Sequence, residues 1–218
     1  IYTEADKDTP YVREADQAFK LSDSYLNSKE ILDIALKSNS DAIHPGYGFL
    51  SENAAFANQV KKLNIKWVGP SSNAIKKMGD KLTAKEIAIK ANVPTLPMTS
   101  DPKKANSIGY PILVKAAAGG GGKGMRIVEK AKDLKESIKA AEREAEGGFG
   151  DKRVFLERYI KRSRHIEIQI LGDSFGNIVH LGERECSIQR RHQKIIEESP
   201  SPMVDDEMRE KMGEAAIK

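Results

Sequence analysis

The sequence predicts an α/β unit followed by an α+β unit, with a boundary between residues 75 and 80. Two patterns support this prediction. Up to about residue 72, short strand-like runs alternate with helix-like runs, an order typical of a parallel sheet with crossover helices. Later in the chain, two strands flank a run of glycines, then a helix follows, and several more strands come after it. That second order favours antiparallel pairs of strands.

Charge and composition are those of a folded globular chain. Of the 218 residues, 39% are hydrophobic and 31% are charged, and 36 basic against 32 acidic residues give a formal charge of +4. The basic residues are spread along the chain, which favours a solvated surface over a nucleic-acid patch. No apolar run approaches the roughly 18 residues that a membrane-spanning helix needs. We therefore expect neither a nucleic acid nor a membrane as a partner.

The single cysteine, Cys186, excludes an intramolecular disulfide and a zinc cluster built on cysteines. It fits a reducing compartment, so we expect a cytoplasmic protein, or one of the mitochondrial matrix if the source is eukaryotic.

Both ends of the chain read as cuts, which predicts a fragment. Residues 1–4 look like a strand already under way, without an initiator methionine. The helical pattern over 207–218 has no stop signal.

In the α/β unit, four short runs are strand-like. They are 1–4, 18–21, 41–44 and 66–68. Helices are predicted over 28–38 and 51–63, where Ser28 and Ser51 are suited to capping the first turn.

The second of these helices carries Phe56, Val60 and Leu63 at helical spacing, which predicts a core-facing stripe. The glycine-containing turn over 44–48 follows the third strand. Its glycines indicate either a close approach of the backbone to a ligand or a tight connection between strand and helix.

Two helices begin near Ser71 and Met78, and the second runs to about Asn92, where a proline-containing segment ends it. A further helix over 132–146 carries an apolar face made of Leu134, Ile138, Ala141 and Ala145. Strands are predicted over 111–116, 125–128, 154–160, 165–171 and 177–186, and a hairpin turn joins the last two.

The glycine run gives the most specific local signal. Gly119, Gly121 and Gly124 form a G-x-G-x-x-G pattern, but a strand follows it, whereas a Rossmann loop leads into a helix. A Walker loop needs Lys and then Ser or Thr after its last glycine, and Met125 and Arg126 stand there instead. The remaining interpretations are a glycine hairpin that folds over phosphates with its free amides, or a mobile linker.

Two lysines stand where a triphosphate needs cations. Lys115 ends an apolar strand beside the glycine run, and Lys81 lies just inside a helix start. The alternative for each is a solvated side chain.

The strand over 165–171 alternates cleanly, with His165, Glu167 and Gln169 on one face. That polar face suits either a binding site or a sheet surface open to solvent.

The stretch 184–194 is dense in hydrogen-bond donors, because it holds cationic side chains together with two amides. Such density fits a small anion such as phosphate or bicarbonate. An exposed basic loop and an RNA-facing strip are the alternatives, although no interleaved aromatic residue is available to stack on a base.

Taken together, these stretches resemble the biotin carboxylase component of biotin-dependent carboxylases, the group that acts on acetyl-CoA, propionyl-CoA and pyruvate. The matching segments are HPGYGFLSEN at 44–53, GPS at 69–71, MGDK at 78–81, KAAAGGGGKGM at 115–125, RHIEIQ at 164–169 and ERECSIQRRHQK at 183–194. The resemblance implies a Rossmann-like N-terminal domain over 1–78, lacking its first strand and helix, and an incomplete ATP-grasp domain over 79–218. The lid of the ATP-grasp domain would lie at about 93–160.

The resemblance also implies roles for individual residues. Lys194 would bind bicarbonate as the catalytic position. The positions implied for ATP are Lys81, Lys115, Gly121, Gly122, Glu157, Arg158, Tyr159, Ile160, His165, Gln189 and His192. Among them, the two lysines would hold phosphates and the two glycines would close over them. The backbone over 157–160 would meet adenine, and the last three residues would line the rest of the nucleotide pocket.

The activity implied is ATP-dependent carboxylation of biotin by bicarbonate through carboxyphosphate. Its cofactors would be ATP, Mg or Mn and biotin on a carrier domain, with a carboxyltransferase component as partner and a homodimer or larger complex as the assembly. The metal ligands and the catalytic arginine would lie beyond Lys218, so the fragment alone is not expected to turn over substrate.

Two other functions stay open from the sequence. One is a different ATP-grasp ligase that activates a carboxylate, such as half of a carbamoyl-phosphate synthetase. The other is a nucleotide-binding regulatory module without catalysis.

Overall fold

The computed structural model describes residues 1–118 and 124–218. The chain separates into two compact units, Ile1–Gly79 and Asp80–Lys218. The predicted phosphate contacts Gly121 and Gly122 fall outside the described residues. No described helix is both long enough and apolar enough to cross a bilayer.

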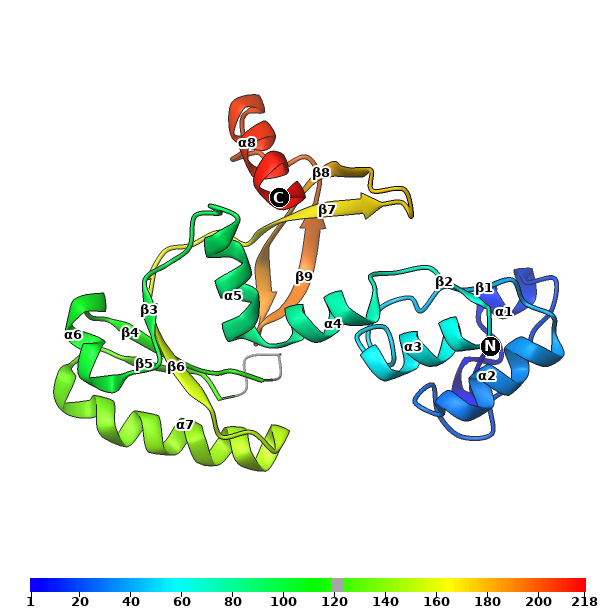
Figure 1. The fold of residues 1–218 in the computed structure, drawn as a ribbon, viewed down its shortest axis with the longest axis horizontal. Helices are drawn as coiled ribbons and strands as arrows, with labels where there is room; N and C mark the ends of the chain where they lie inside the picture. The colour runs from blue at the N-terminus through cyan, green and yellow to red at the C-terminus, as the bar shows by residue number, and fades with distance from the viewer. Residues whose placement is uncertain (119–123) are drawn as a thin grey trace. The chain divides into compact units, whose positions relative to one another are not determined.

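The first unit combines helices with short parallel strand pairs (Figure 1). Its elements are η1 (Glu4–Asp6), α1 (Pro10–Glu14), α2 (Ser28–Lys37), β1 (Ala42–Ile43), α3 (Ala54–Lys62), β2 (Lys66–Trp67) and α4 (Ser72–Gly79). Strands β1 and β2 pair in parallel, as the alternation predicts. The predicted strands at 1–4 and 18–21 shrink to one parallel bridge between Tyr2 and Lys20, because the chain turns into a 3-10 helix at Glu4.

The helix caps differ from the prediction by one or two residues. Asn27 caps α2 by accepting a hydrogen bond from the Glu30 amide at 3.2 Å. Asn53 caps α3 in the same way, with the Phe56 amide at 2.9 Å. The predicted caps Ser28 and Ser51 are therefore wrong, because in both places a neighbouring asparagine supplies the acceptor that a cap requires.

The core of the first unit gathers buried side chains from α2, α3 and the segments around them. Its buried members are Leu21, Ile31, Ala35, Leu50, Phe56, Val60 and Ile65. Phe56 and Val60 confirm the predicted stripe on α3. Leu63 does not, because it lies at the C-cap and is 37% exposed.

The second unit begins with α5 (Lys81–Lys90) and a four-stranded antiparallel sheet of order β3-β6-β4-β5. The strands are β3 (Met98–Thr99), β4 (Ile112–Ala116), β5 (Arg126–Val128) and β6 (Val154–Arg158). Short helices η2 (Pro102–Lys104), α6 (Ala105–Ile108) and η3 (Ala131–Asp133) connect them. Helix α7 (Leu134–Phe149) runs along one face of the sheet (Figure 1). Leu134, Ala141 and Ala145 are buried on it, and Ile138 packs against the same core, which confirms the predicted apolar face.

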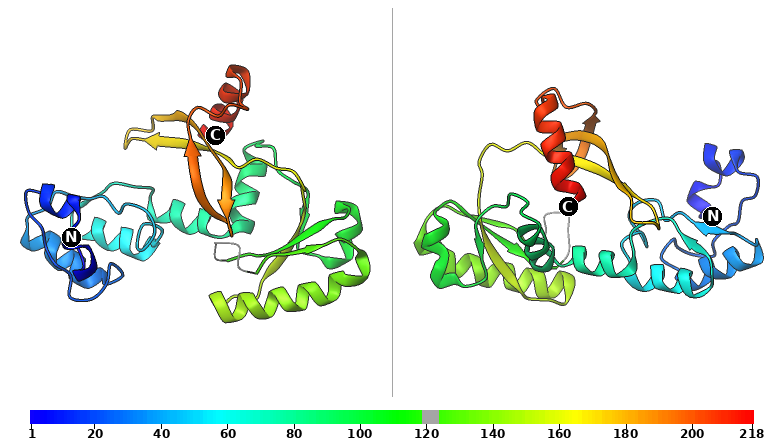
Figure 2. Two further views of the ribbon diagram at one scale, coloured as in Figure 1. Left: turned by 180° about the vertical axis from the view of Figure 1, so that it is seen from behind. Right: turned by 45° about the horizontal axis from the view of Figure 1, so that its top comes forward.

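A second, three-stranded antiparallel sheet contains β7 (Ile166–Gly172), β8 (Ile178–Arg190) and β9 (Gln193–Glu198). Helix α8 (Asp206–Ile217) packs on β7 and β8 (Figure 2). The prediction that β8 stops at Cys186 is wrong, since the strand continues to Arg190. Arg191 and His192 then form a two-residue turn with φ of 51° and 66°, and β9 follows. A turn of this conformation usually contains Asn or Gly, so the residue types at this turn do not predict it.

Candidate functional site

The four-stranded sheet has one face against α7 and a second face that carries polar side chains. On β4, Ile112 and Val114 are buried in the core under α7, and alternation places Lys115 on the other face. Lys115 pairs across the sheet with Phe155, and its Nζ lies 5.6 Å from the centre of that ring. The same Nζ lies 3.1 Å from Oε2 of Glu157, two residues further along β6. The strand pairing thus presents a lysine at the entry to the glycine run.

Helix α5 brings a second lysine to the same strand end. Asp80 caps the helix by accepting from the Thr83 amide at 2.9 Å, so Lys81 occupies the first helical position. The Lys81 ammonium donates to the Ala116 carbonyl at 3.1 Å, and its amide donates to the Ala117 carbonyl at 3.2 Å. The two lysines predicted to meet phosphates therefore lie at the same end of β4.

The charges in this cluster are unbalanced in favour of cations. Lys85 and Lys115 both pair with one carboxylate, Glu157, and Lys81 lies close enough to Lys115 for their charges to interact. Burial, together with the charge of Lys115, lowers the pKa of Lys81. Burial alone would raise the pKa of Glu157, but the hydrogen bond from Lys85 and the charge of Lys115 outweigh it, so this pKa is lowered. The lysines outnumber this one ionised carboxylate, and their surplus positive charge makes a site suited to a polyanion.

A second group of predicted residues meets at the start of the three-stranded sheet. His165 stands immediately before β7, and its Nδ1 lies 2.7 Å from Nε2 of Gln189 on β8. The same amide nitrogen donates to the Cys186 carbonyl at 2.8 Å. The His165 amide donates to the Ser187 hydroxyl at 2.8 Å. An amide that donates to Nδ1 leaves Nε2 as the protonated nitrogen of the ring.

Lys194 belongs to an ion-pair network on the same sheet. It lies directly opposite Gln189 in the β8–β9 register and pairs with Glu167 on β7. Arg184 reaches the other oxygen of Glu167 at 2.6 Å and donates to Gln169 at 3.0 Å. The hydrogen bond to Glu167 raises the pKa of Lys194, which keeps it charged. The partners from β8 confirm that His165, Glu167 and Gln169 form one polar face.

Sequence reasoning misses both carboxylate partners of the predicted lysines. It places Glu167 only on a polar face, and it gives Glu157 only a backbone contact with adenine. The pairing of Lys115 with Glu157 follows from the β4–β6 register, which joins residues 42 apart in the chain. The alternation on β7 is the one available signal for Glu167.

The predicted adenine contact at 157–160 is partly used by the fold itself. The Arg158 amide donates to the Pro97 carbonyl at 3.0 Å, and the Tyr159 amide donates to the Pro111 carbonyl at 3.0 Å. The Arg158 guanidinium donates to the Tyr110 carbonyl at 3.0 Å. A base would therefore meet other groups of this segment, such as those of Ile160, which is 45% exposed.

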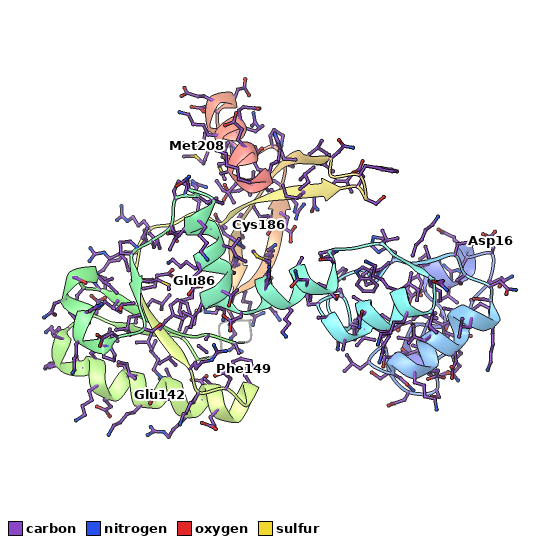
Figure 3. All side chains as sticks on the ribbon, in the orientation of Figure 1. Asp16, Glu86, Glu142, Phe149, Cys186 and Met208 are labelled. Atoms are coloured by element: carbon purple, nitrogen blue, oxygen red, sulfur yellow. The ribbon has the colours of Figure 1, made fainter. Side chains whose placement is uncertain are left out.

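One group in the described part of the chain has the spacing of metal ligands. Glu167, Cys186 and Glu197 each place a ligand atom within 4.8 Å of the others. Both carboxylates already pair with Arg184 and Lys194. Burial raises the pKa of the Cys186 thiol, which stands within the three-stranded sheet (Figure 3). A neutral thiol and two neutralised carboxylates favour an ion-pair network over a cation site.

The predicted residues thus fall into two groups. Lys81, Lys115 and Glu157 form one, and His165, Gln189 and Lys194 form the other, with His192 exposed in the hairpin turn beside it. Across residues 1–118 and 124–218, no hydrogen bond or ion pair joins the two groups.

Comparison with known families divides the chain at the same place as the structure. Residues 1–75 match the family described as biotin carboxylase, N-terminal domain. Residues 80–218 match the family described as carbamoyl-phosphate synthase L chain, ATP binding domain.

Individual relatives are similar over the whole chain. The mitochondrial methylcrotonoyl-CoA carboxylase subunit alpha of Dictyostelium discoideum is 50% identical over 230 residues, covering 100% of this chain and 33% of the relative. A biotin carboxylase complex with β-γ-ATP from Campylobacter jejuni has a TM-score of 0.91 and 48% identity, covering 99% of this chain and 51% of that one.

A third relative is the biotin carboxylase domain dimer of Hydrogenobacter thermophilus 2-oxoglutarate carboxylase, solved with MgADP, ADP and bicarbonate. It has a TM-score of 0.89 and 42% identity over 99% of this chain and 50% of that chain. The chain spans between a third and about half of the length of these three relatives.

Proposed function

This chain belongs to the biotin carboxylase family, and from that premise we propose that its protein carboxylates biotin with bicarbonate and ATP. In the proposed reaction a bicarbonate oxygen attacks the γ-phosphorus of ATP, and the bond to ADP breaks. The resulting carboxyphosphate releases CO2 and phosphate. The ureido nitrogen of biotin passes its proton to the released phosphate and takes up CO2.

The observation that carries the proposal is the surplus positive charge of Lys81 and Lys115 at the end of β4. Burial and mutual repulsion disfavour two ammonium groups in one place, as the lowered pKa of Lys81 reflects. A triphosphate reverses that cost, since its oxygens pair with both lysines. Phosphoryl transfer depends mainly on such positioning and charge stabilisation rather than on covalent help.

The proposed roles of the other predicted residues fit the side chains that surround them. Lys194, held charged by Glu167, is proposed to bind bicarbonate. His165 and Gln189 are proposed to contact the nucleotide as a hydrogen-bonded pair, with His192 beside them. Gly121 and Gly122 are proposed to close over the phosphates, and 157–160 to border adenine.

The metal is proposed to be Mg or Mn, which would supply positive charge to the phosphates during phosphoryl transfer. Carboxylate ligands for it are proposed to lie beyond Lys218, in the part of the relatives that this chain does not span. The solved neighbour that contains MgADP and bicarbonate supports Mg as the metal and bicarbonate as a substrate.

Relatives of this chain belong to multidomain or multisubunit biotin-dependent carboxylases. We propose a biotin carboxyl carrier domain and a carboxyltransferase as partners, and a homodimer or larger complex as the assembly. A reducing compartment, the cytoplasm or the mitochondrial matrix, is the proposed location.

The test is ATP hydrolysis by the complete gene product with Mg, free biotin and varied bicarbonate. We expect hydrolysis that depends on bicarbonate and yields carboxybiotin. Hydrolysis driven by ammonia, with carbamoyl phosphate as product, would replace this function with that of a carbamoyl-phosphate synthetase. ATP binding without turnover would replace it with a regulatory module.

A further inference from the structure

A third lysine, Lys85, which sequence reasoning does not single out, joins the cluster of Lys81, Lys115 and Glu157 through an ion pair. Lys85 stands one turn after Lys81 on α5, so both side chains lie on the same face of the helix. The Lys85 ammonium pairs with Oε1 of Glu157 on β6. The Lys85 side chain is only 11% exposed and that of Glu157 only 13%, so solvent screens this pair less than a surface pair.

Glu157 divides its two oxygens between two lysines. Oε1 accepts from Lys85, and Oε2 accepts from Lys115 at 3.1 Å. Lys115 is the more accessible of the two lysines, with 24% of its side chain exposed, and it stands at the strand end beside Lys81. The carboxylate therefore joins a buried lysine to a second lysine that can face a ligand.

These contacts create a conflict when a polyanion arrives. To bind the polyanion, Lys115 must donate hydrogen bonds to phosphate oxygens in place of part of its bonding to Glu157. A carboxylate left without a cation in this largely buried place is costly, and it would also repel the phosphates. Lys85 resolves the conflict because its ion pair with Glu157 does not involve the ligand.

We propose that Lys85 is a positioning residue that keeps Glu157 neutralised, so that Lys115 is released to bind the phosphates of ATP. The proposal rests on the proposed function for the identity of the ligand as a nucleoside triphosphate. Without Lys85, Lys115 would be the one cation left on Glu157 within residues 1–118 and 124–218, and Glu157 would compete with the nucleotide for it.

The experiment is a double-mutant cycle on the complete gene product, with the dissociation constant of MgATP measured by calorimetry. Lys85→Met is expected to weaken ATP binding about tenfold, the size of one charge-assisted hydrogen bond. Lys85→Arg is expected to restore it. Lys85→Met combined with Glu157→Gln is expected to bind ATP within about twofold of Glu157→Gln alone, because the competing carboxylate is gone.

Two outcomes would overturn the proposal. One is unchanged ATP affinity in a folded Lys85→Met protein. The other is a double variant that binds much more weakly than Glu157→Gln, since Lys85 would then act on the nucleotide itself or on the fold. If Lys85→Met fails to fold, Lys85→Gln takes its place in the cycle, and unchanged ATP affinity in that variant would overturn the proposal in the same way.

Steady-state kinetics separate this proposal from the proposed function. Lys85→Met should raise the KM for ATP about tenfold and leave kcat within about threefold. ATP affinities measured without bicarbonate can still follow the pattern expected for the double-mutant cycle. That result would support the role of Lys85 even if the protein showed no bicarbonate-dependent reaction.

Discussion

Arg209 on α8 binds Glu183 on β8 through two parallel hydrogen bonds, Nε to Oε2 at 2.8 Å and Nη2 to Oε1 at 2.9 Å. The Glu183 side chain is 1% exposed, and it also accepts from the Ser201 amide at 3.0 Å. The pair fastens the last helix to the sheet that carries Gln189 and Lys194. It is therefore a support of the candidate site rather than a part of it.

Arg209→Ala should lower the free energy of unfolding by about 3 kcal/mol, because it leaves a buried carboxylate without its cation. Urea denaturation of the complete gene product would measure this. Lys211→Ala is the matched control, since its pair with Glu207 lies on the exposed side of the same helix, and it should cost at most about 0.5 kcal/mol. Equal effects of the two substitutions would contradict the anchoring role.

The same pair predicts a loss of stability in acid. The hydrogen bonds from Arg209 lower the pKa of Glu183 from 4.5 to about 2. Because the folded pKa is depressed, the stabilisation is complete above pH 4.5 and is lost as the pH falls toward 2. Urea midpoints measured across this range should fall more steeply for the native sequence than for Glu183→Gln. Parallel curves would refute the assignment.

The helix cap at Asn53 gives a local test of the fold. Asn53→Ala should destabilise the first unit by about 1 kcal/mol, because the Phe56 amide loses its acceptor. Ser51→Ala, at the position that sequence reasoning favours, should change the free energy of unfolding by less than about 0.5 kcal/mol. A larger loss of stability in Ser51→Ala than in Asn53→Ala would contradict the assignment of the cap to Asn53.

Lys194→Ala should separate bicarbonate chemistry from nucleotide binding. We expect kcat for bicarbonate-dependent ATP hydrolysis to fall about a hundredfold, because the substituted side chain no longer places a charge beside the bicarbonate that Lys194 is proposed to bind. The dissociation constant of MgATP should stay within about threefold of the native value. Full activity in this variant, with Lys211→Ala as the surface control, would exclude a bicarbonate role for Lys194.

Local patterns predict the parts of the fold that depend on neighbours in sequence. The apolar face of α7 follows from spacing alone, and so do the strands on either side of the glycine run. The position of Lys115, at the end of an apolar strand and next to glycines, is enough to make it a candidate for phosphate binding. Each of these features lies within a few residues of the signal that reveals it.

Features that depend on distant residues escape the same reasoning. Lys85 and Glu157 are 72 residues apart, and only the tertiary fold makes them partners. The strand β9 is not predicted because Arg191 and His192 turn the chain with side chains that do not usually occupy such a turn. The caps are predicted at the wrong residues because asparagine and serine stand within two residues of each other at both helix starts, and both residue types can cap a helix.

The tight turn at Arg191 and His192 fixes a spacing across the hairpin. Gln189 and Lys194 face each other as one cross-strand pair, so their side chains project from the same side of the sheet. Inserting a single residue on one strand would shift the register and turn one of the two away. The separation between the proposed nucleotide contact and the proposed bicarbonate contact is thereby set within one hairpin, and sliding of neighbouring domains cannot stretch it.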